Sequence, residues 1–554
     1  MRPVATLACS ATALMLTFAG VDAQRILTTV VGTAAADGLG ATLAGCGDLD
    51  GDGVVDFAVG ATPGTSQLYP YVRLCSGRDG SILRTLTTRV TGEEWGAAIA
   101  DIGDVTGDGV RDVAIGVPSR LVGVLFGAVE LYSGRDGARI ATVMETTPLP
   151  GGLGHRLLGV DDVDADGTPD FVATAPSGPG TGGGHVRVYS GRTRALLRAI
   201  TFGSRRNERT TSVALVGDFD QDGVREIVAG DAEVNTGAGR VAVFNLRTGA
   251  TVRTVAGRAQ PQAGLGFVVA GLGDVDRDGV PDFAATAQTE SNLLGVVRTG
   301  AVFAWSGQTG NVLWALYGTR TDGAFGASLA NLGDLDGDSA DDLAIGTGEF
   351  EGSLGSGQGQ IVFVSGASGA QLMRMEGLRP FGRFGKVCAS LGDIDRDGFR
   401  DLLVGAPAES APLASQGVAR VISGRILADA TIEGIGCGGG PFIPLLGGTR
   451  PLVGTTAHLA GEWAPPVPGF LLLSPPPTGP TNLGVPACRA YVDPARAVVL
   501  AQIAPGSGRW SLPLPVPGLP GFPGLELSFQ VIYGPTLGPL GFDLTGGLRW
   551  RIGW

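Results

Sequence analysis

Residues 47–61 read GDLDGDGVVDFAVGA, and this stretch decides the fold because an acidic loop runs directly into an apolar segment. The loop contains the aspartates Asp48, Asp50, Asp52 and Asp56, with Gly53 among them. The segment after the loop is almost continuously apolar, which is typical of a strand buried on both faces. Carboxylates beside a buried strand need partners, because buried charges are paired or bind metals.

The same stretch recurs, so that the chain contains seven copies of it in total. The aspartates equivalent to Asp48 follow one another at intervals of 56–60 residues, at 48, 104, 162, 218, 274, 334 and 393. Each unit also contains a glycine pair before the loop, such as FG at 384–385, and a break after it, such as GAP at 405–407. A strand ending in Ser-Gly follows, such as VRLCSG at 72–77. We count four short strands per unit, A to D, and the acidic loop joins A to B.

Four short strands in a radially repeated unit are typical of a β-propeller blade. We therefore predict an all-β fold, with a seven-bladed β-propeller over residues 24–432. The stacking of neighbouring blades covers both faces of each sheet, which explains the apolar strands. For closure of the ring, we predict that RILTTVVG (25–32) is the outer strand of the seventh blade, and RILADATIEG (425–434) is the competing candidate.

A loop of the form D-x-D-x-D-G-x-x-D offers side-chain oxygens at positions 1, 3, 5 and 9 and a backbone carbonyl at position 7. Calcium binds 6–8 oxygens at ~2.3–2.6 Å, which this spacing can supply. An EF-hand is excluded because it needs flanking helices and an acid at position 12, where the first loop has Val59. The alternative is a set of solvated Asp-Gly turns, but the recurring ligand spacing favours metal.

We predict up to seven structural Ca²⁺ sites. Their ligands are, loop by loop, Asp48, Asp50, Asp52, Val54 and Asp56; Asp104, Thr106, Asp108, Val110 and Asp112; Asp162, Asp164, Asp166, Thr168 and Asp170; Asp218, Asp220, Asp222, Val224 and Glu226; Asp274, Asp276, Asp278, Val280 and Asp282; Asp334, Asp336, Asp338, Ala340 and Asp342; Asp393, Asp395, Asp397, Phe399 and Asp401.

Three loops depart from the pattern at Thr106, Glu226 and Ser339, and we predict that the second loop, with Thr106, is the weakest site. The loops hold 27 of the 53 acidic residues, so the net charge of −13 reflects metal sites rather than basic partners. We expect no nucleic acid partner.

On these residues the chain resembles the FG-GAP repeat family, best known from the β-propeller of integrin α-subunits. The FG, DxDxDGxxD and GAP elements occur in order over residues ~25–432. The resemblance implies seven blades with calcium in the A–B hairpins on the lower face, and partners that bind the opposite, upper face. We find no inserted metal-dependent adhesion domain, no transmembrane segment and no cytoplasmic tail, so the resemblance does not imply a heterodimeric receptor.

The two ends of the chain differ from the repeats. Residues 1–23 have an early arginine, an apolar stretch and a small-residue site before Gln24, which predicts a signal peptide and a secreted, extracellular or cell-surface protein, with the periplasm as the alternative. Residues 433–554 are rich in Pro and Gly around strand-like runs, which predicts a small C-terminal β-sandwich-like domain. Cys46 and Cys75 lie two strands apart, too far for a disulfide, whereas Cys437 and Cys488 can pair.

We predict a binding or adhesion module for an extracellular glycan or protein ligand rather than an enzyme. His155 and His185 are interpreted as loop residues of the third unit rather than an active-site pair, and we find no catalytic motif. The alternative is an extracellular polysaccharide-processing enzyme on a calcium-stabilised propeller. The sequence leaves the oligomeric state open.

The predicted upper face carries a candidate anion-binding sector, formed by the D-to-A connections into blades 4–7. Clustered guanidinium groups bind carboxylates, sulfates or phosphates, although ordinary solvated arginine is the competing interpretation. The sector comprises Arg205, Arg206, Arg209, Arg258, Arg320, Arg379 and Arg383.

Overall fold

The computed structural model describes most of the repeat region and the strands beyond it. The described residues are 26–425, except 63–68, 89–93, 123, 145–151, 176–183, 203–211, 233–236, 258–262, 292–295, 353 and 411–412, followed by strands β29–β39 alone. Residues 1–23, with the predicted signal peptide, lie outside this set, as do Cys437 and Cys488.

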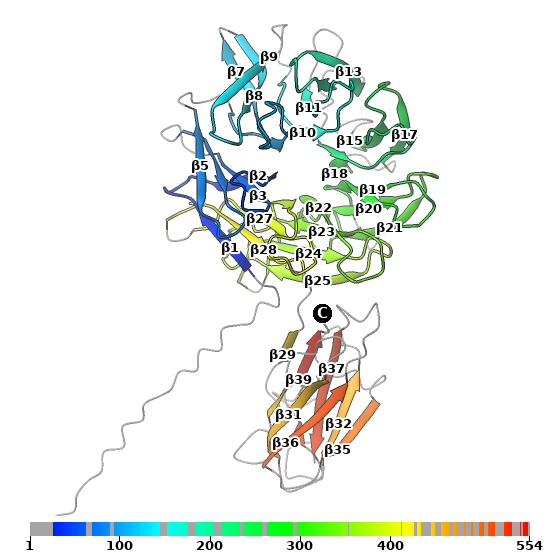
Figure 1. Cartoon of the computed structure of the whole chain (residues 1–554). Helices are drawn as coiled ribbons and strands as arrows, with labels where there is room; N and C mark the ends of the chain where they lie inside the picture. The colour runs from blue at the N-terminus through cyan, green and yellow to red at the C-terminus, as the bar shows by residue number, and fades with distance from the viewer. Residues whose placement is uncertain are drawn as a thin grey trace, which may run out of the picture.

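Seven four-stranded antiparallel sheets surround a common axis, which confirms the seven-bladed propeller (Figure 1). Blade 1 consists of β2 (Leu39–Gly47), β3 (Asp56–Ala61), β4 (Tyr71–Cys75) and β5 (Ile82–Thr87). Blade 2 consists of β6 (Ile99–Asp101), β7 (Val113–Val122), β8 (Val124–Tyr132) and β9 (Arg139–Met144). Blade 3 consists of β10 (Leu157–Val160), β11 (Asp170–Ala175), β12 (Gly184–Tyr189) and β13 (Leu196–Phe202).

The next three blades repeat the same strand order. Blade 4 consists of β14 (Ser212–Leu215), β15 (Ile227–Asp231), β16 (Arg240–Phe244) and β17 (Thr251–Ala256). Blade 5 consists of β18 (Leu265–Gly273), β19 (Asp282–Ala287), β20 (Ala301–Trp305) and β21 (Val312–Tyr317). Blade 6 consists of β22 (Ser328–Gly333), β23 (Asp342–Thr347), β24 (Gln360–Val364) and β25 (Gln371–Glu376).

The seventh blade combines the two ends of the repeat region. Its first three strands are β26 (Val387–Ser390), β27 (Leu402–Ala406) and β28 (Val418–Ile422). Its outer strand is β1 (Ile26–Val31), which pairs antiparallel with β28, with Val31 opposite Val418. The first of the two candidate closing strands is therefore the correct one. The competing segment contributes β29 (Asp429–Glu433), which pairs with β39 (Gly547–Arg551) instead.

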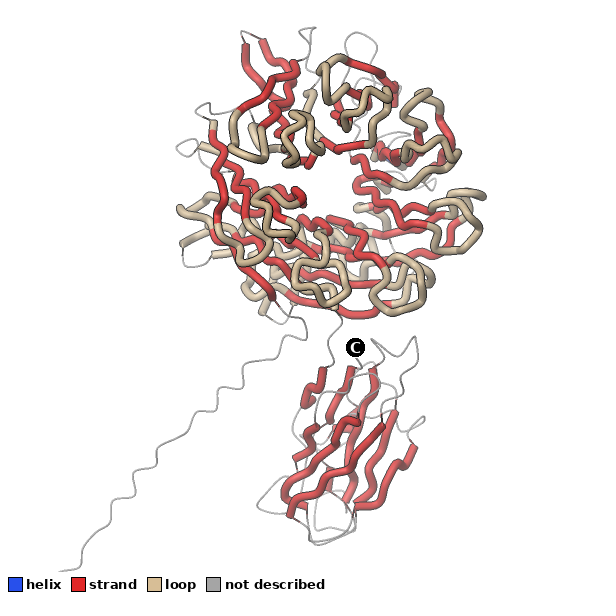
Figure 2. The backbone as a smooth tube through the Cα atoms, in the orientation of Figure 1, coloured by secondary structure: helices blue, strands red, loops and turns tan. Residues whose placement is uncertain are grey.

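Strand A of each blade lies next to the axis and contacts strand A of the neighbouring blades around the ring. Figure 2 shows these strands as the innermost of each blade, with loops connecting the strands of the sheets. A cavity of about 870 Å³ runs along the axis, and its wall includes Leu43, Leu158 and Cys388. Strand B lies between two strands of its own sheet and is buried on both faces, as in Asp56–Ala61 and Asp342–Thr347. The continuous apolar runs in the sequence are these strands.

The glycine pairs found before the loops of six blades fix the connection from one blade to the next, whereas the chain before the fourth loop has no glycine between Gly203 and Gly217. The aromatic residue of the pair is buried, as Trp95 and Phe384 show. The following glycine has a left-handed backbone, with φ of 79° at Gly385. A Cβ at Gly385 would lie 2.4 Å from the carbonyl oxygen of Gln360, so a side chain has no room there.

Residues beyond the propeller form further β structure. One sheet has the strand order β29-β39-β37-β32-β35, with β38 paired to β37, a second has the order β30-β31-β36, and β33 pairs with β34. The remaining bounds are β30 (Leu445–Gly448), β31 (Thr456–Ala464), β32 (Gly469–Ser474), β33 (Thr481–Asn482), β34 (Arg489–Ala490), β35 (Val498–Ile503), β36 (Gly508–Pro515), β37 (Glu526–Tyr533) and β38 (Asp543–Leu544). The sandwich-like arrangement and the domain boundary at residue 433 stay predictions.

Candidate metal sites

The seven acidic loops share one face of the propeller. Every blade has the same strand order, and each acidic loop connects strand A to strand B, so all seven loops lie on the same side of the ring, here called the lower face. Each loop is organised by three carboxylates that accept backbone N–H groups, at positions 1, 5 and 9.

The aspartate at position 1 shapes the turn. In the first loop, Asp48 accepts the N–H of Gly51 at 2.7 Å and the N–H of Gly53 at 2.8 Å. Burial disfavours ionisation of Asp48, but these backbone donors outweigh it and hold its pKa below the usual value. The bond from position 6 to position 1 occurs in all seven loops, at 2.7–2.9 Å.

Position 6 has a left-handed backbone, with φ of 80° at Gly53. Ser339 occupies this position in the sixth loop with φ of 68°, and its N–H still donates to Asp334 at 2.8 Å. The departure at Ser339 therefore leaves the shape of the loop intact, at the cost of a strained backbone.

The carboxylate at position 9 lies at the inner end of each loop, and this residue is fully buried in all seven loops. Asp56 accepts the N–H of Leu49 at 2.7 Å through one oxygen and the N–H of Gly77 at 2.9 Å through the other. Gly77 belongs to the Ser-Gly pair that ends strand C. This residue pair therefore connects the acidic loop to the C–D turn of the same blade.

Burial raises the pKa of the position-9 carboxyls, and neighbouring loop carboxylates add to the effect. The pKa is raised to about 6 for Asp56, to about 7 for Asp401 and to about 8 for Asp342. Burial is the larger cause of these shifts, and the smaller contribution comes from carboxylates of the same loop that repel one another. A bound cation would offset this repulsion.

The aspartate at position 5 faces both its own loop and the C–D turn. Asp52 accepts the N–H of Val54 at 2.8 Å, and its second oxygen pairs with Arg78 of the C–D turn at 2.7 Å. Arg135 holds Asp108 in the same way in the second blade, at 3.1 Å. In blade 5, the hydroxyl of Ser306 donates to Asp278 at 3.1 Å.

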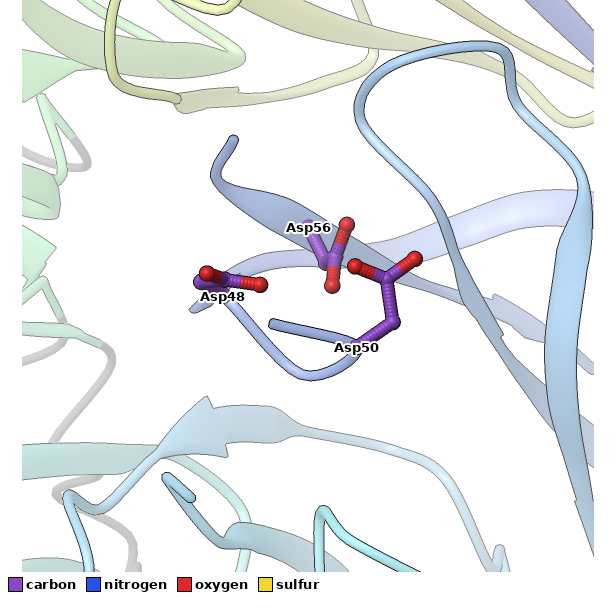
Figure 3. Close-up of side chains that lie close together, drawn as sticks. All are labelled: Asp48, Asp50 and Asp56. Carbon is purple, nitrogen blue, oxygen red and sulfur yellow. The ribbon is translucent and has the colours of Figure 1, made fainter. Parts of the chain in front are cut away.

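The carboxylates of one loop converge on a common point. In at least five loops, one oxygen from each of the side chains at positions 1, 3 and 9 lies within 4.8 Å of the others. Figure 3 shows this arrangement for Asp48, Asp50 and Asp56. These five clusters are in the first, third, fourth, fifth and sixth loops. An all-oxygen, acidic ligand set fits a hard cation such as Ca²⁺, so the residues present are suitable for the predicted metal.

The fourth loop departs from this scheme in three residues at once. Position 9 is Glu226, and the Ser-Gly pair is replaced by Asn245 and Leu246. The Asn245 side chain donates to Asp220 at 2.8 Å and to Glu226 at 3.1 Å. The sequence pattern revealed Glu226 as a departure, but the exchange at 245–246 was missed, although comparison of NLRTG (245–249) with SGRDG (76–80) could have revealed it.

The other candidate residues lie away from the loops. His155 lies in the connection before β10, but His185 lies in strand β12, so its interpretation as a loop residue was wrong. The reason is that strand C begins directly after a glycine run, and His185 is paired opposite Ala175.

The arginine sector is described only in part. Arg320 pairs with Glu351 at 2.7 Å, and Arg383 pairs with Glu349 at 3.0 Å. The two glutamates lie on the connection between strands B and C of blade 6. Arg379 is also described, whereas Arg205, Arg206, Arg209 and Arg258 lie outside the described residues. Two arginines of the predicted sector therefore have acidic partners within the protein. Among the residues described, no helix is both long and apolar enough to cross a membrane.

Comparisons with known proteins agree with this architecture. The FG-GAP repeat family matches residues 389–422, which cover most of the seventh blade. The chain is 35% identical to integrin alpha-V of Gallus gallus over 149 residues, which are 26% of this chain and 14% of that protein. It is 31% identical to integrin alpha-8 of Mus musculus over 208 residues, 34% of this chain and 19% of that protein.

A third relative is integrin alpha pat-2 of Caenorhabditis elegans, 25% identical over 285 residues, 48% of this chain and 19% of that protein. The chain thus spans less than a fifth of the length of each of these three relatives. The repeat match, the integrin α relatives and the seven blades together show that the chain contains a β-propeller of the integrin α-like FG-GAP type.

Proposed function

We propose that this protein is a secreted binding or adhesion module whose propeller holds structural Ca²⁺ in its lower-face loops and recognises an extracellular glycan or protein ligand. The observation that carries the proposal is the convergence of three carboxylates within 4.8 Å in the first, third, fifth and sixth loops of an integrin α-like propeller. A fold that gathers so many mutually repelling charges at equivalent places is best explained by a divalent cation at those places.

The metal would act on structure rather than on a substrate. The carboxylates at positions 1 and 9 connect strand A to strand B, and position 9 also binds the C–D turn through Gly77 in the first blade. A cation among them would hold three strands of one blade together at the lower end. The proposal therefore separates a lower face that stabilises the ring from an upper face that is available for a partner.

The ligand would bind the upper face. The D-to-A connections there present Arg379 and the strongly exposed Phe381, whose side chain is 68% exposed. An anionic ligand is the narrower version of the proposal, and it would have to compete with Glu349 and Glu351 for the nearby arginines. The absence of an enzymatic activity is part of the same proposal.

The test is a binding screen of the full secreted chain on glycan and matrix-protein arrays. It is run at about 2 mM free Ca²⁺, above the dissociation constants of ~10⁻⁴–10⁻³ M that extracellular calcium sites have, and again with excess chelator. We expect ligand binding that requires calcium, and no new reducing or unsaturated ends on any polysaccharide. An Arg379→Ala variant tests the anionic version, since it should weaken binding to acidic polysaccharides alone. Turnover of a polysaccharide would contradict the proposal and favour the enzyme.

A further inference from the structure

The fourth acidic loop differs from the other six in how its carboxylates are neutralised. In those six blades, a glycine N–H at the end of strand C donates to one oxygen of the position-9 aspartate, at 2.8–3.1 Å. The fourth blade has Leu246 at that place and Glu226 at position 9. Glu226 receives the Asn245 side chain instead, at 3.1 Å.

The glycine is required by a close approach. A Cβ at Gly307 in the fifth blade would lie 2.0 Å from the carbonyl oxygen of Pro281, and the equivalent clash at Gly77 would be 1.9 Å from Val55. Leu246 therefore cannot occupy the same position relative to its loop. Its side chain is instead fully buried in the apolar cluster that includes Val163 and Val224.

The exchanges in the fourth blade compensate one another. The N–H of Phe219 still donates to one oxygen of Glu226 at 2.6 Å, but without the glycine N–H the other oxygen needs a new donor, because a buried carboxylate oxygen without one is costly. Glutamate is one methylene longer than aspartate, and asparagine is longer than serine and carries two N–H donors. The hydrogen bond from the longer Asn245 side chain to the longer Glu226 side chain therefore replaces the one that the glycine N–H makes in the other blades.

The Asn245 amide reaches further into the loop than serine does. Its nitrogen lies 2.8 Å from an oxygen of Asp220, 3.1 Å from Glu226 and 3.5 Å from Asp222. These are the side chains at positions 3, 9 and 5. The equivalent Ser306 brings one hydroxyl proton, which goes to Asp278 at position 5. The amide therefore places partial positive charge where a cation would bind in another loop.

Two hydrogen bonds from Thr248 fix the orientation of the Asn245 side-chain amide. The Asn245 oxygen accepts the backbone N–H of Thr248 at 2.7 Å and its hydroxyl at 2.8 Å. A backbone N–H can only donate, so turning the amide to offer its oxygen to a metal would bring two donors together. Asn245 is 3% exposed, which leaves little room for another rotamer. It cannot become a metal ligand without breaking the C–D turn.

We infer that Asn245 replaces the cation in the fourth loop, so that this loop is closed by hydrogen bonds and stays free of Ca²⁺ while its neighbours are loaded. The inference rests on the proposed calcium function of the other loops. It differs from the order expected from the sequence alone, in which the second loop, with Thr106, is the weakest site. A complete set of acids at positions 1, 3, 5 and 9, which the fourth loop shares with five others, is therefore not enough to make a loop bind metal.

The direct test counts the ions bound by the full chain, by native mass spectrometry or by equilibrium dialysis with elemental analysis. Two matched variants remove the position-3 carboxylate, Asp220→Ala in the fourth loop and Asp276→Ala in the fifth. We expect Asp276→Ala to bind one ion fewer than the wild type and Asp220→Ala to bind the same number. An ion lost in both variants would overturn the inference and leave the proposed calcium function intact.

A gain-of-site variant supplies the second measurement. Asn245→Asp keeps the side-chain shape and the Thr248 contacts, but replaces the amide nitrogen with an oxygen; we expect one additional ion and a lower melting temperature in chelator. The control is Ser306→Asp, which adds a carboxylate beside a loop that already binds and should add no ion. An unchanged count in Asn245→Asp would contradict the inference. If neither the wild type nor any variant binds an ion, the proposed calcium function fails together with this inference.

Discussion

Replacement of Asp276 by alanine should have opposite consequences with and without calcium. Asp276 is exposed, and one of its oxygens lies within 4.8 Å of oxygens of Asp274 and Asp282. At that separation, removal of one charge relieves a repulsion of about 0.9 kcal/mol with each of these two neighbours in water-like surroundings. The only hydrogen bond lost among those described is from the N–H of Asp278 at 3.2 Å, worth ~0.5–1.5 kcal/mol. In chelator, the two effects nearly cancel, and the free energy of unfolding should change by less than about 1 kcal/mol.

With calcium present, the same variant should be clearly less stable. A site that binds only the folded protein contributes about 2.7 kcal/mol when free Ca²⁺ is 100 times the dissociation constant. Loss of the site removes this contribution. The assay is equilibrium urea unfolding, followed by tryptophan fluorescence, of wild type and variant in both buffers. A control, Asp322→Ala, removes an exposed aspartate that pairs with Arg298 on the opposite face. Its effect should be the same in both buffers. An equal loss for Asp276→Ala with and without calcium would refute the metal interpretation.

Three further predictions follow from the lower-face loops and from ring closure. The metal-free protein should lose stability as pH rises from 5 to 8. Burial raises the folded-state pKa of the position-9 carboxyls, to about 8 for Asp342, so the folded state binds more protons than the unfolded state over this range. Thermal melting in chelator at each pH measures this, and a melting temperature that rises with pH would contradict it. Gly307→Ala should destabilise the protein by roughly 1–3 kcal/mol, because its Cβ would lie 2.0 Å from the Pro281 carbonyl oxygen; chemical denaturation checks this, with unchanged stability as the contrary result. Deletion of Ile26–Val31 should open the ring, because this segment is the outer strand of the seventh blade; hydrogen exchange should then increase first in β28, and unchanged protection there would contradict this closure.

The repeat spacing was sufficient to predict the blades because an acidic loop recurs at the same place in each unit. Seven aspartates at nearly constant intervals fix the number of sheets, and the Ser-Gly ends of strand C mark the turn in six of the seven blades. Ring closure is a contact between residues separated by almost the whole repeat region, Val31 and Val418. Local pattern alone therefore left two candidates, and only the pairing of β1 with β28 decided between them.

The metal-site geometry was predictable to the level of ligand types but not of hydrogen bonds. Aspartates at positions 1, 3 and 9 converge as the spacing requires. The pattern could not show that Arg78 occupies one oxygen of Asp52, or that Asn245 reaches Asp220, because both contacts come from the C–D turn. A ligand motif read in isolation omits residues that fold back on it from the next hairpin.

Calcium titration of the metal-free full chain by isothermal calorimetry tests the central claim most directly. We expect several Ca²⁺ ions to bind per chain, with no ion in the fourth loop, and a melting temperature that rises with free calcium and falls in chelator. Absence of binding heat, together with one melting curve in calcium and in chelator, would contradict it.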